Sequence, residues 1–197
     1  MDVSGLDTSR RRRVPTAAAY ETDKPTWHFL DAERHAQQEY LEEELPRRLN
    51  QLRSHSRDET RWVVHSASDR TQGSYHLLTW ENDGARRELT PLFDASPWLR
   101  EDELAQMQPI SYTSRDGLTI HGYLTVPTGV QPRNLPLLLN PHGGPWLRDS
   151  WGFNPEVQFL ANCGAAVLRS TIAGQQATGR RSGRRASASG VSPCRTT

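Results

Sequence analysis

The chain has 197 residues, of which 35% are hydrophobic and 8% aromatic, a composition that is lean for a soluble domain but too apolar for a wholly disordered chain. No apolar run approaches the length of a membrane span, and none near the N-terminus follows a basic region as in a signal peptide, so we expect a cytoplasmic protein with no membrane partner. Cys163 and Cys194 are too few for a disulfide scaffold and lie near no histidine cluster. We therefore expect free thiols, no metal and no cofactor.

Charge is distributed unevenly along the chain. The overall net charge is +1, but residues 169–197 contain six arginines and neither acidic nor aromatic residues. Residues 1–168 therefore hold 18 basic and 23 acidic residues, a net charge of −5. This break in composition predicts that residues 169–197 are an irregular, disordered tail distinct from the body of the protein.

Turn and helix signals indicate mainly short strands in the first half of the body. Residues 1–19 carry no clear element, whereas helix-forming residues from Asp31 to about Glu44, with Pro46 beyond, predict a short helix. Stretches separated by turn-forming residues predict an antiparallel meander of three strands, at residues 61–68, 74–80 and 86–93. Such a meander suits either a sandwich or a propeller blade.

The pattern changes after Pro97 and Trp98. Further strands are predicted at residues 110–114, 118–126 and 135–139, and the last is a continuous apolar run typical of a strand buried on both faces of an α/β sheet. Asn154 as N-cap, Pro155 at the first helical position and Gly164 as terminator then predict a helix, which precedes an apolar strand at 165–168. Strand, loop, helix and strand make a βαβ unit.

The loop inside this unit carries the most specific motif of the chain. Residues 140–146 read Asn-Pro-His-Gly-Gly-Pro-Trp, directly after the apolar strand. A His-Gly-Gly sequence in that position is typical of the loop that supplies one wall of the oxyanion hole in α/β-hydrolases. Glycine lets a backbone N–H come within about 3 Å of a developing oxyanion. A plain tight turn between strand and helix would use the same residues.

Several motifs in order resemble the prolyl oligopeptidase family of serine peptidases, in particular its acylaminoacyl-peptidase and dipeptidyl-peptidase-like bacterial members. The motifs are Ile-Ser-Tyr-Thr-Ser-Arg-Asp-Gly-Leu-Thr-Ile-His-Gly-Tyr-Leu from Ile110, Pro-His-Gly-Gly-Pro-Trp from Pro141, and Asp-Ser-Trp-Gly-Phe-Asn-Pro-Glu-Val-Gln-Phe-Leu-Ala-Asn from Asp149. Residues 20–31 and 58–93 look like the last part of the β-propeller that precedes the catalytic domain. The resemblance implies a mixed fold, with the end of a β-propeller at 1–98 and the first part of an α/β-hydrolase domain at 99–168.

The resemblance also implies a Ser-His-Asp mechanism that cleaves short or N-acylated peptides through an acyl-enzyme. The oxyanion-loop positions are occupied by His142, Gly143 and Gly144. The resemblance implies that the two glycines donate their backbone N–H groups and that His142 supports the loop. Trp146 and Trp151 are expected either to pack around that loop or to serve as ordinary apolar anchors. The remaining histidines are expected in the propeller or on the surface, none pairing with both a serine and an acid: His28, His35, His55, His65, His76 and His121.

The chain contains no Gly-x-Ser-x-Gly nucleophile motif, and in an α/β-hydrolase the catalytic acid and base follow that motif. We therefore expect a truncated fragment that is at best partly folded and inactive alone, and the composition break predicts that residues from about Arg169 onward are a frameshifted reading. Two alternatives are a non-catalytic interaction module and nonspecific binding of nucleic acid or acidic lipid through the arginine-rich tail. Both rank below the peptidase, so we expect a peptide partner and no nucleic acid.

Overall fold

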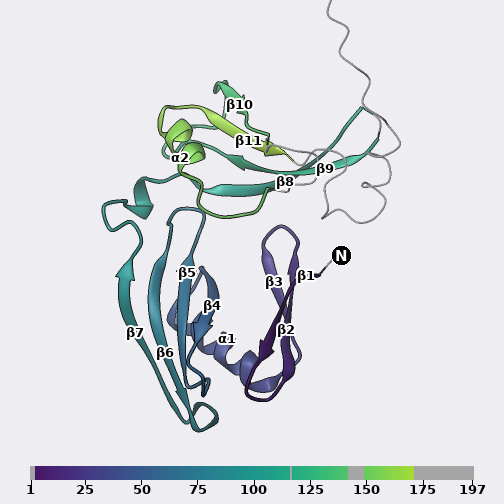
Figure 1. Ribbon diagram of the computed structural model, residues 1–197. Helices are drawn as coiled ribbons and strands as arrows, with labels where there is room; N and C mark the ends of the chain where they lie inside the picture. The colour runs from purple at the N-terminus through teal and green to yellow at the C-terminus, as the bar shows by residue number, and fades with distance from the viewer. Residues whose placement is uncertain (1–2, 116, 142–148, 171–197) are drawn as a thin grey trace, which may run out of the picture.

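A computed structural model describes residues 3–115, 117–141 and 149–170, which form three β-sheets with two α-helices (Figure 1). The first sheet contains β1 (Val3–Ser9), β2 (Val14–Glu21) and β3 (Pro25–Phe29). The second contains β4 (Leu49–His55), β5 (Arg61–Ala67), β6 (Ser74–Glu81) and β7 (Arg86–Asp94). Both sheets are antiparallel, with their strands adjacent in chain order.

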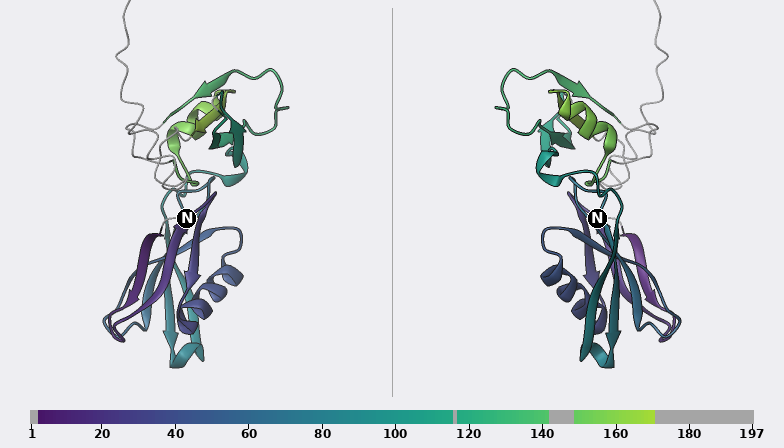
Figure 2. Two further views of the ribbon diagram at one scale, coloured as in Figure 1. Left: turned by 90° about the vertical axis from the view of Figure 1, so that its right-hand side faces the viewer. Right: turned by 90° about the vertical axis from the view of Figure 1, so that its left-hand side faces the viewer.

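The third sheet has the strand order β10-β11-β9-β8. Its strands are β8 (Met107–Thr113), β9 (Thr119–Thr125), β10 (Leu137–Leu139) and β11 (Ala166–Ser170). β10 and β11 are parallel and are joined through α2 (Pro155–Asn162), whereas β8, β9 and β11 pair antiparallel. The βαβ unit expected from the sequence is therefore present, and Figures 1 and 2 show this sheet at one end of the second sheet.

Helix α1 (Ala32–Glu44) connects the first sheet to the second and lies against one side of them (Figure 2). The side chain of Asp31 accepts a hydrogen bond from the backbone N–H of Arg34 at 3.0 Å, which confirms the predicted helix start. Tyr40 and Leu41 of α1 pack against the sheet in a buried cluster with Val64, Leu78 and Trp80. This cluster is the apolar core of the helix and the second sheet.

Asn50, which is 1% exposed, ties the end of α1 to the second sheet. Its Nδ2 donates to the carbonyl oxygens of Leu41 at 3.0 Å and Leu45 at 3.1 Å, while its Oδ1 accepts from the hydroxyl of Ser66 at 2.6 Å. The amide thus gives the carbonyl of Leu45 a donor at the helix end and adds a second donor to the carbonyl of Leu41, which also accepts from the N–H of Leu45.

The predicted meander is confirmed as β5, β6 and β7. Alternate residues of β6 are buried, namely Ser74, His76, Leu78 and Trp80, as expected for a strand with one face against a core. The turn before β6 requires Gly73, because φ is +102° and a Cβ there would lie 2.5 Å from the carbonyl oxygen of Ser66. Local turn chemistry therefore sets the register of this sheet.

The sequence did not reveal β1 to β4. β2 contains three consecutive alanines, and β4 reads Leu-Asn-Gln-Leu-Arg-Ser-His without a β-branched residue, so the strand signal is weak in both. Cross-strand pairing decides their conformation instead. The predicted tail boundary also falls inside a strand, because β11 continues through Arg169 and Ser170. Residues 171–197 lie outside the described part of the chain.

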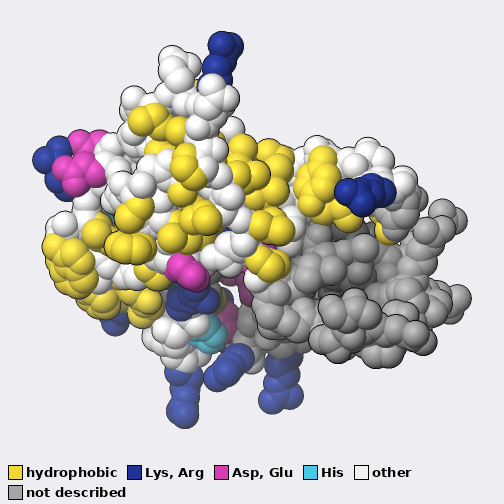
Figure 3. Space-filling model, turned by 90° about the horizontal axis from the view of Figure 1, so that it is seen from above, with side chains coloured by type: hydrophobic (Ala, Val, Ile, Leu, Met, Phe, Trp, Pro, Cys, Tyr) yellow, Lys and Arg dark blue, Asp and Glu magenta, His cyan; other side chains and the backbone are white. Residues whose placement is uncertain are grey.

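The expectation that residues 135–139 form a strand buried on both faces is wrong. Only residues 137–139 are extended as β10, and Leu137, Leu138 and Leu139 are 60%, 40% and 62% exposed. The physical reason is that little covers the faces of β10, because it is the edge strand of its sheet and α2 packs mainly against β11. Figure 3, viewed from the side of this sheet, shows hydrophobic side chains across much of the face.

Candidate functional site

A buried polar junction joins the second sheet to the third. The carboxylate of Asp69, in the turn before β6, accepts a hydrogen bond from the backbone N–H of Met107 at 2.7 Å. The side-chain amide of Gln158, in α2, donates to the carbonyl oxygens of Asp69 at 2.9 Å and Ala105 at 2.8 Å, and its oxygen accepts from the N–H of Ala105 at 2.9 Å. Asp69 and Gln158 are both buried, so these bonds are shielded from water.

An apolar cluster lies beside these hydrogen bonds. Met107, Tyr123 and Trp151 are buried together, and Leu49 at the start of β4 packs against them. The indole N–H of Trp151 points to the carbonyl oxygen of Met107 at 3.4 Å. Trp151 is therefore an apolar anchor of the junction, one of the two roles expected for it.

The turn between β2 and β3 also reaches the third sheet. The hydroxyl of Tyr123 donates to the carbonyl oxygen of Asp23 at 2.9 Å, and the ammonium of Lys24 lies 4.0 Å from the ring centroid of Trp151. A cation over an indole face is attracted by the ring quadrupole. All three sheets thus meet at the junction.

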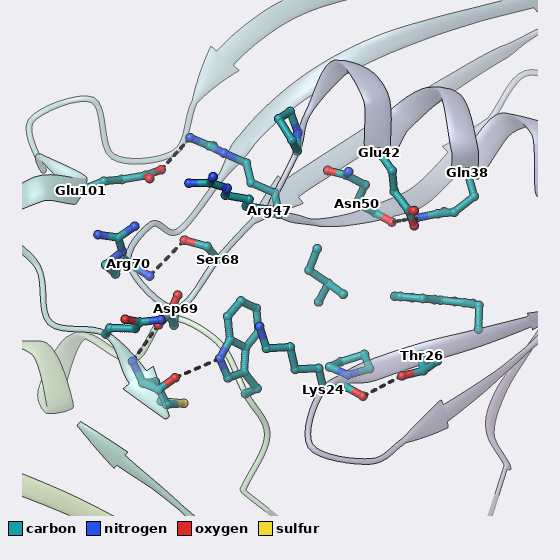
Figure 4. A pocket seen from close by; sticks show the side chains of 18 of the residues that line it. Lys24, Thr26, Gln38, Glu42, Arg47, Asn50, Ser68, Asp69, Arg70 and Glu101 are labelled. Atoms are coloured by element: carbon teal, nitrogen blue, oxygen red, sulfur yellow. Dashed lines mark hydrogen bonds and ion pairs between the residues drawn. The ribbon is translucent and has the colours of Figure 1, made fainter. Parts of the chain in front are cut away.

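A cavity of about 950 Å³ opens at this meeting point (Figure 4). Its walls come from the β2–β3 turn, α1, the α1–β4 loop, the turn before β6 and the start of β8. Four basic side chains line it, Lys24, Arg47, Arg48 and Arg70, together with three acidic ones, Glu42, Asp69 and Glu101. The aromatic side chains of Trp27, Phe29 and Trp151 also line the cavity. The volume lies within the range of small-molecule sites.

The predicted oxyanion-loop residues, His142, Gly143 and Gly144, lie outside the described residues, as does Trp146. The structure describes the two ends of their loop. The N–H of Asn140, directly after β10, donates to the carbonyl oxygen of Leu168 in β11 at 2.9 Å. Where the described chain resumes, buried Asp149 forms an ion pair with Arg169. The described residues on either side of residues 142–148, Asn140 and Asp149, therefore both contact β11.

One of these histidines, His76, pairs with a serine. The Nε2 of His76 lies 2.8 Å from the hydroxyl of Ser74, two residues earlier on the buried face of β6. Burial lowers the pKa of His76, and the nearby charge of Arg48 lowers it further, whereas Asp94 raises it. Asp94 acts on His76 electrostatically, so the group differs from a catalytic triad, in which the acid binds the imidazole directly.

The other predicted histidines are distributed over the sheets and α1. His28 is in β3, His35 in α1, and His121 in β9 of the third sheet. His55 and His65 pack against the aromatic rings of Trp62 and Tyr75. Cys163 is an exposed free thiol, and Cys194 lies outside the described residues.

Within the described ranges, no group of three or more histidine, cysteine, aspartate or glutamate side chains is arranged to hold a metal ion. Neither helix in that part of the chain is long and apolar enough to cross a membrane.

The chain resembles known peptidases in sequence, although no protein-family model matches it. It is 33% identical over 187 residues to dipeptidyl aminopeptidase BIII of Pseudoxanthomonas mexicana, in a match that covers 91% of this chain and 26% of the relative. It is 28% identical over 165 residues to dipeptidyl peptidase family member 6 of Caenorhabditis elegans, in a match that covers 73% of this chain and 22% of that relative. The chain therefore spans about a quarter of the length of these curated relatives.

Solved structures of peptidases share the fold. Acylaminoacyl peptidase of Pyrococcus horikoshii superimposes with a TM-score of 0.57 over 88% of this chain and 26% of its own, at 15% identity. Puromycin hydrolase superimposes with a TM-score of 0.50 at 24% identity, over 64% of this chain and 19% of its own. The sequence relatives are named as peptidases, and the solved structures show that the fold is shared. These likenesses support a place in the prolyl oligopeptidase family, which the motifs from Ile110 onward resemble.

Asp69, Gln158, Arg47 and Arg70 were not predicted as site residues. Asp69 and Arg70 lie in a segment that reads as an ordinary turn, and Gln158 looks like a polar position of an amphipathic helix. No local pattern distinguishes these residues from solvated ones, because their partners or neighbours in the cavity come from distant parts of the chain.

Replacing Gln158 with leucine should destabilise the protein by about 2–4 kcal/mol, because the buried N–H and carbonyl of Ala105 and the carbonyl of Asp69 would lose their partner. The same replacement at exposed Gln108 on β8 is the control and should change stability by less than about 0.5 kcal/mol. Urea unfolding followed by tryptophan fluorescence measures both. If both variants changed the free energy of unfolding by the same small amount, the junction would contribute little to stability.

The free energy of unfolding should fall as the pH is lowered from 7.5 to 5.5. His76 has a lowered pKa in the folded state, so its contribution is complete above the unfolded value of about 6.5 and is lost as the pH falls toward the folded value. His76→Gln, which retains an acceptor for Ser74, should flatten this dependence. An unchanged slope in urea titrations of that variant would contradict the assignment.

Proposed function

We propose that the whole protein is a serine-type oligopeptidase that cleaves short or N-acylated peptides through an acyl-enzyme intermediate. Residues 1–98 would form the last part of a β-propeller, and residues 99–168 the first part of the α/β-hydrolase domain. The observation that carries the proposal is the 33% identity to a dipeptidyl aminopeptidase over 187 residues. The His-Gly-Gly sequence at 142–144, which follows β10, is the part of this chain nearest to the chemistry.

The order of elements supports the two-domain assignment. The meander β4–β7 is a four-stranded antiparallel sheet, the unit from which propellers are built. The third sheet begins with the antiparallel pair β8 and β9 and continues with the parallel unit of β10, α2 and β11. A loop after a strand of such a sheet is where α/β proteins place their ligands.

The role proposed for this chain in the reaction is to bind the oxyanion. When a serine attacks the peptide carbonyl, its oxygen becomes negatively charged, and the backbone N–H groups of Gly143 and Gly144 would donate hydrogen bonds to it. One such donor is worth about 3–4 kcal/mol of transition-state stabilisation. The serine and the histidine that takes its proton would lie in sequence other than the 197 residues given, which contain no Gly-x-Ser-x-Gly.

The 197-residue chain alone should not hydrolyse peptides, because oxyanion donors without a nucleophile cannot form an acyl-enzyme. Purified protein is incubated with dipeptidyl and N-acyl-aminoacyl chromogenic substrates, and separately with a fluorophosphonate probe. We expect neither product release nor labelling. Hydrolysis that the fluorophosphonate abolishes would overturn this prediction.

We also propose that residues beyond about Arg169 come from a shifted reading frame. Restoring one base near the codon of Leu168 should open a frame that runs to a Gly-x-Ser-x-Gly motif and then to an aspartate and a histidine. The protein from the restored gene should cleave the same substrates, and Gly144→Val should lower its kcat by about a hundredfold or more. Gene sequencing that reveals no such frame would refute the frameshift.

A further inference from the structure

The cavity at the junction carries more positive than negative charge. Its four basic side chains exceed its three acidic ones, and the acidic side chains already have partners. Glu101 pairs with Arg48 at 2.6 Å, and Asp69 accepts from the N–H of Met107 at 2.7 Å. Glu42 accepts from Gln38 at 3.2 Å. Lys24, Arg47 and Arg70 have no carboxylate partner in the described part of the chain.

Arg47 and Arg70 lie at one end of the cavity, near Ser68, whereas Lys24 lies at the other (Figure 4). They come from different loops, Arg47 from the α1–β4 connection and Arg70 from the turn before β6. Two guanidinium groups that line one cavity repel each other, and an anion bound between them would offset that repulsion. Guanidinium groups match the geometry of a carboxylate, which accepts two parallel N–H hydrogen bonds.

The backbone at Arg47 supplies an independent observation. Arg47 has φ of +63°, in the left-handed region that a long side chain adopts rarely and glycine adopts readily. An arginine there is less favourable for the fold than a glycine would be. Backbone strain of this kind is concentrated at functional sites, and the exposed side chain of Arg47 lines the cavity.

We propose that Arg47 and Arg70 bind the carboxylate of a short peptide in this cavity. The rest of the peptide would contact the aromatic wall of Trp27, Phe29 and Trp151. A volume of about 950 Å³ accommodates a peptide of a few residues. The choice of a peptide as ligand rests on the proposed function, whereas the preference for an anion rests on the charges of the cavity alone.

Binding is measured by isothermal titration calorimetry on the 197-residue chain at low ionic strength, where no turnover is needed. The probes are N-acetyl-Ala-Phe-Ala with a free carboxylate, its C-terminal amide, and the amide of N-acetyl-Ala-Phe-Glu. The first and third distinguish a terminal carboxylate from a side-chain carboxylate. We expect at least one of them to bind about tenfold or more tightly than the neutral amide. Equal affinity for all three, or no binding by the folded chain, overturns the proposal.

Variants test the two arginines. Arg47→Gly removes the guanidinium group, so the Kd for the carboxylate peptide should rise about tenfold. The same replacement relieves the backbone strain at φ of +63°, so Tm should stay equal or increase. Arg70→Gln should raise Kd to a similar degree. Arg57→Ala is the matched control, because Arg57 is exposed in the β4–β5 turn and away from the cavity, and it should leave Kd within about twofold.

A comparable loss in Arg57→Ala would indicate general charge screening and would overturn the site. An unchanged Kd in Arg47→Gly and Arg70→Gln would do the same. The result is separable from the proposed function: if the restored protein cleaves no peptide but the carboxylate binds in an Arg47-dependent way, only the peptidase proposal fails.

Discussion

The hydrogen bonds of Asp69 and Gln158 fix how the third sheet sits on the second. Gln158 alone satisfies three buried backbone groups, and two of them belong to Ala105 in the segment that connects the two sheets. A buried amide of this kind is directional, so it specifies one arrangement of the partners where apolar contact would allow several. The neighbouring cluster of Met107, Tyr123 and Trp151 adds apolar burial to that arrangement.

The position of the junction explains where a functional site can form. It holds the β2–β3 turn, the α1–β4 loop and the turn before β6 around one cavity, and these segments supply the basic side chains. The same junction contains α2, which connects β10 to β11, and Asn140 and Asp149 contact β11. A change at Gln158 would therefore affect both the cavity and the packing of α2 beside β11.

Local signals predicted α1, α2 and the meander β5–β7, because caps, prolines and turn residues act over a few positions. β1 to β4 were missed because their conformation depends on pairing with neighbouring strands, which no local pattern specifies. The exposure of Leu137–Leu139 was missed because an apolar run indicates a strand but not how many neighbours cover it. Asp69 and Gln158 were missed because they are 89 residues apart, and the roles of His142, Gly143 and Gly144 stay predictions.

Amide hydrogen exchange at Ala105 and Met107 tests most directly whether the junction makes the second and third sheets one cooperative unit. The backbone N–H groups of both residues donate to side chains of the junction, Gln158 and Asp69. If the junction holds, they should exchange as slowly as the amides of β5 and β6, through global unfolding. Fast exchange at Ala105 and Met107 while β5 and β6 remain protected would show that the third sheet detaches independently, and would contradict this account.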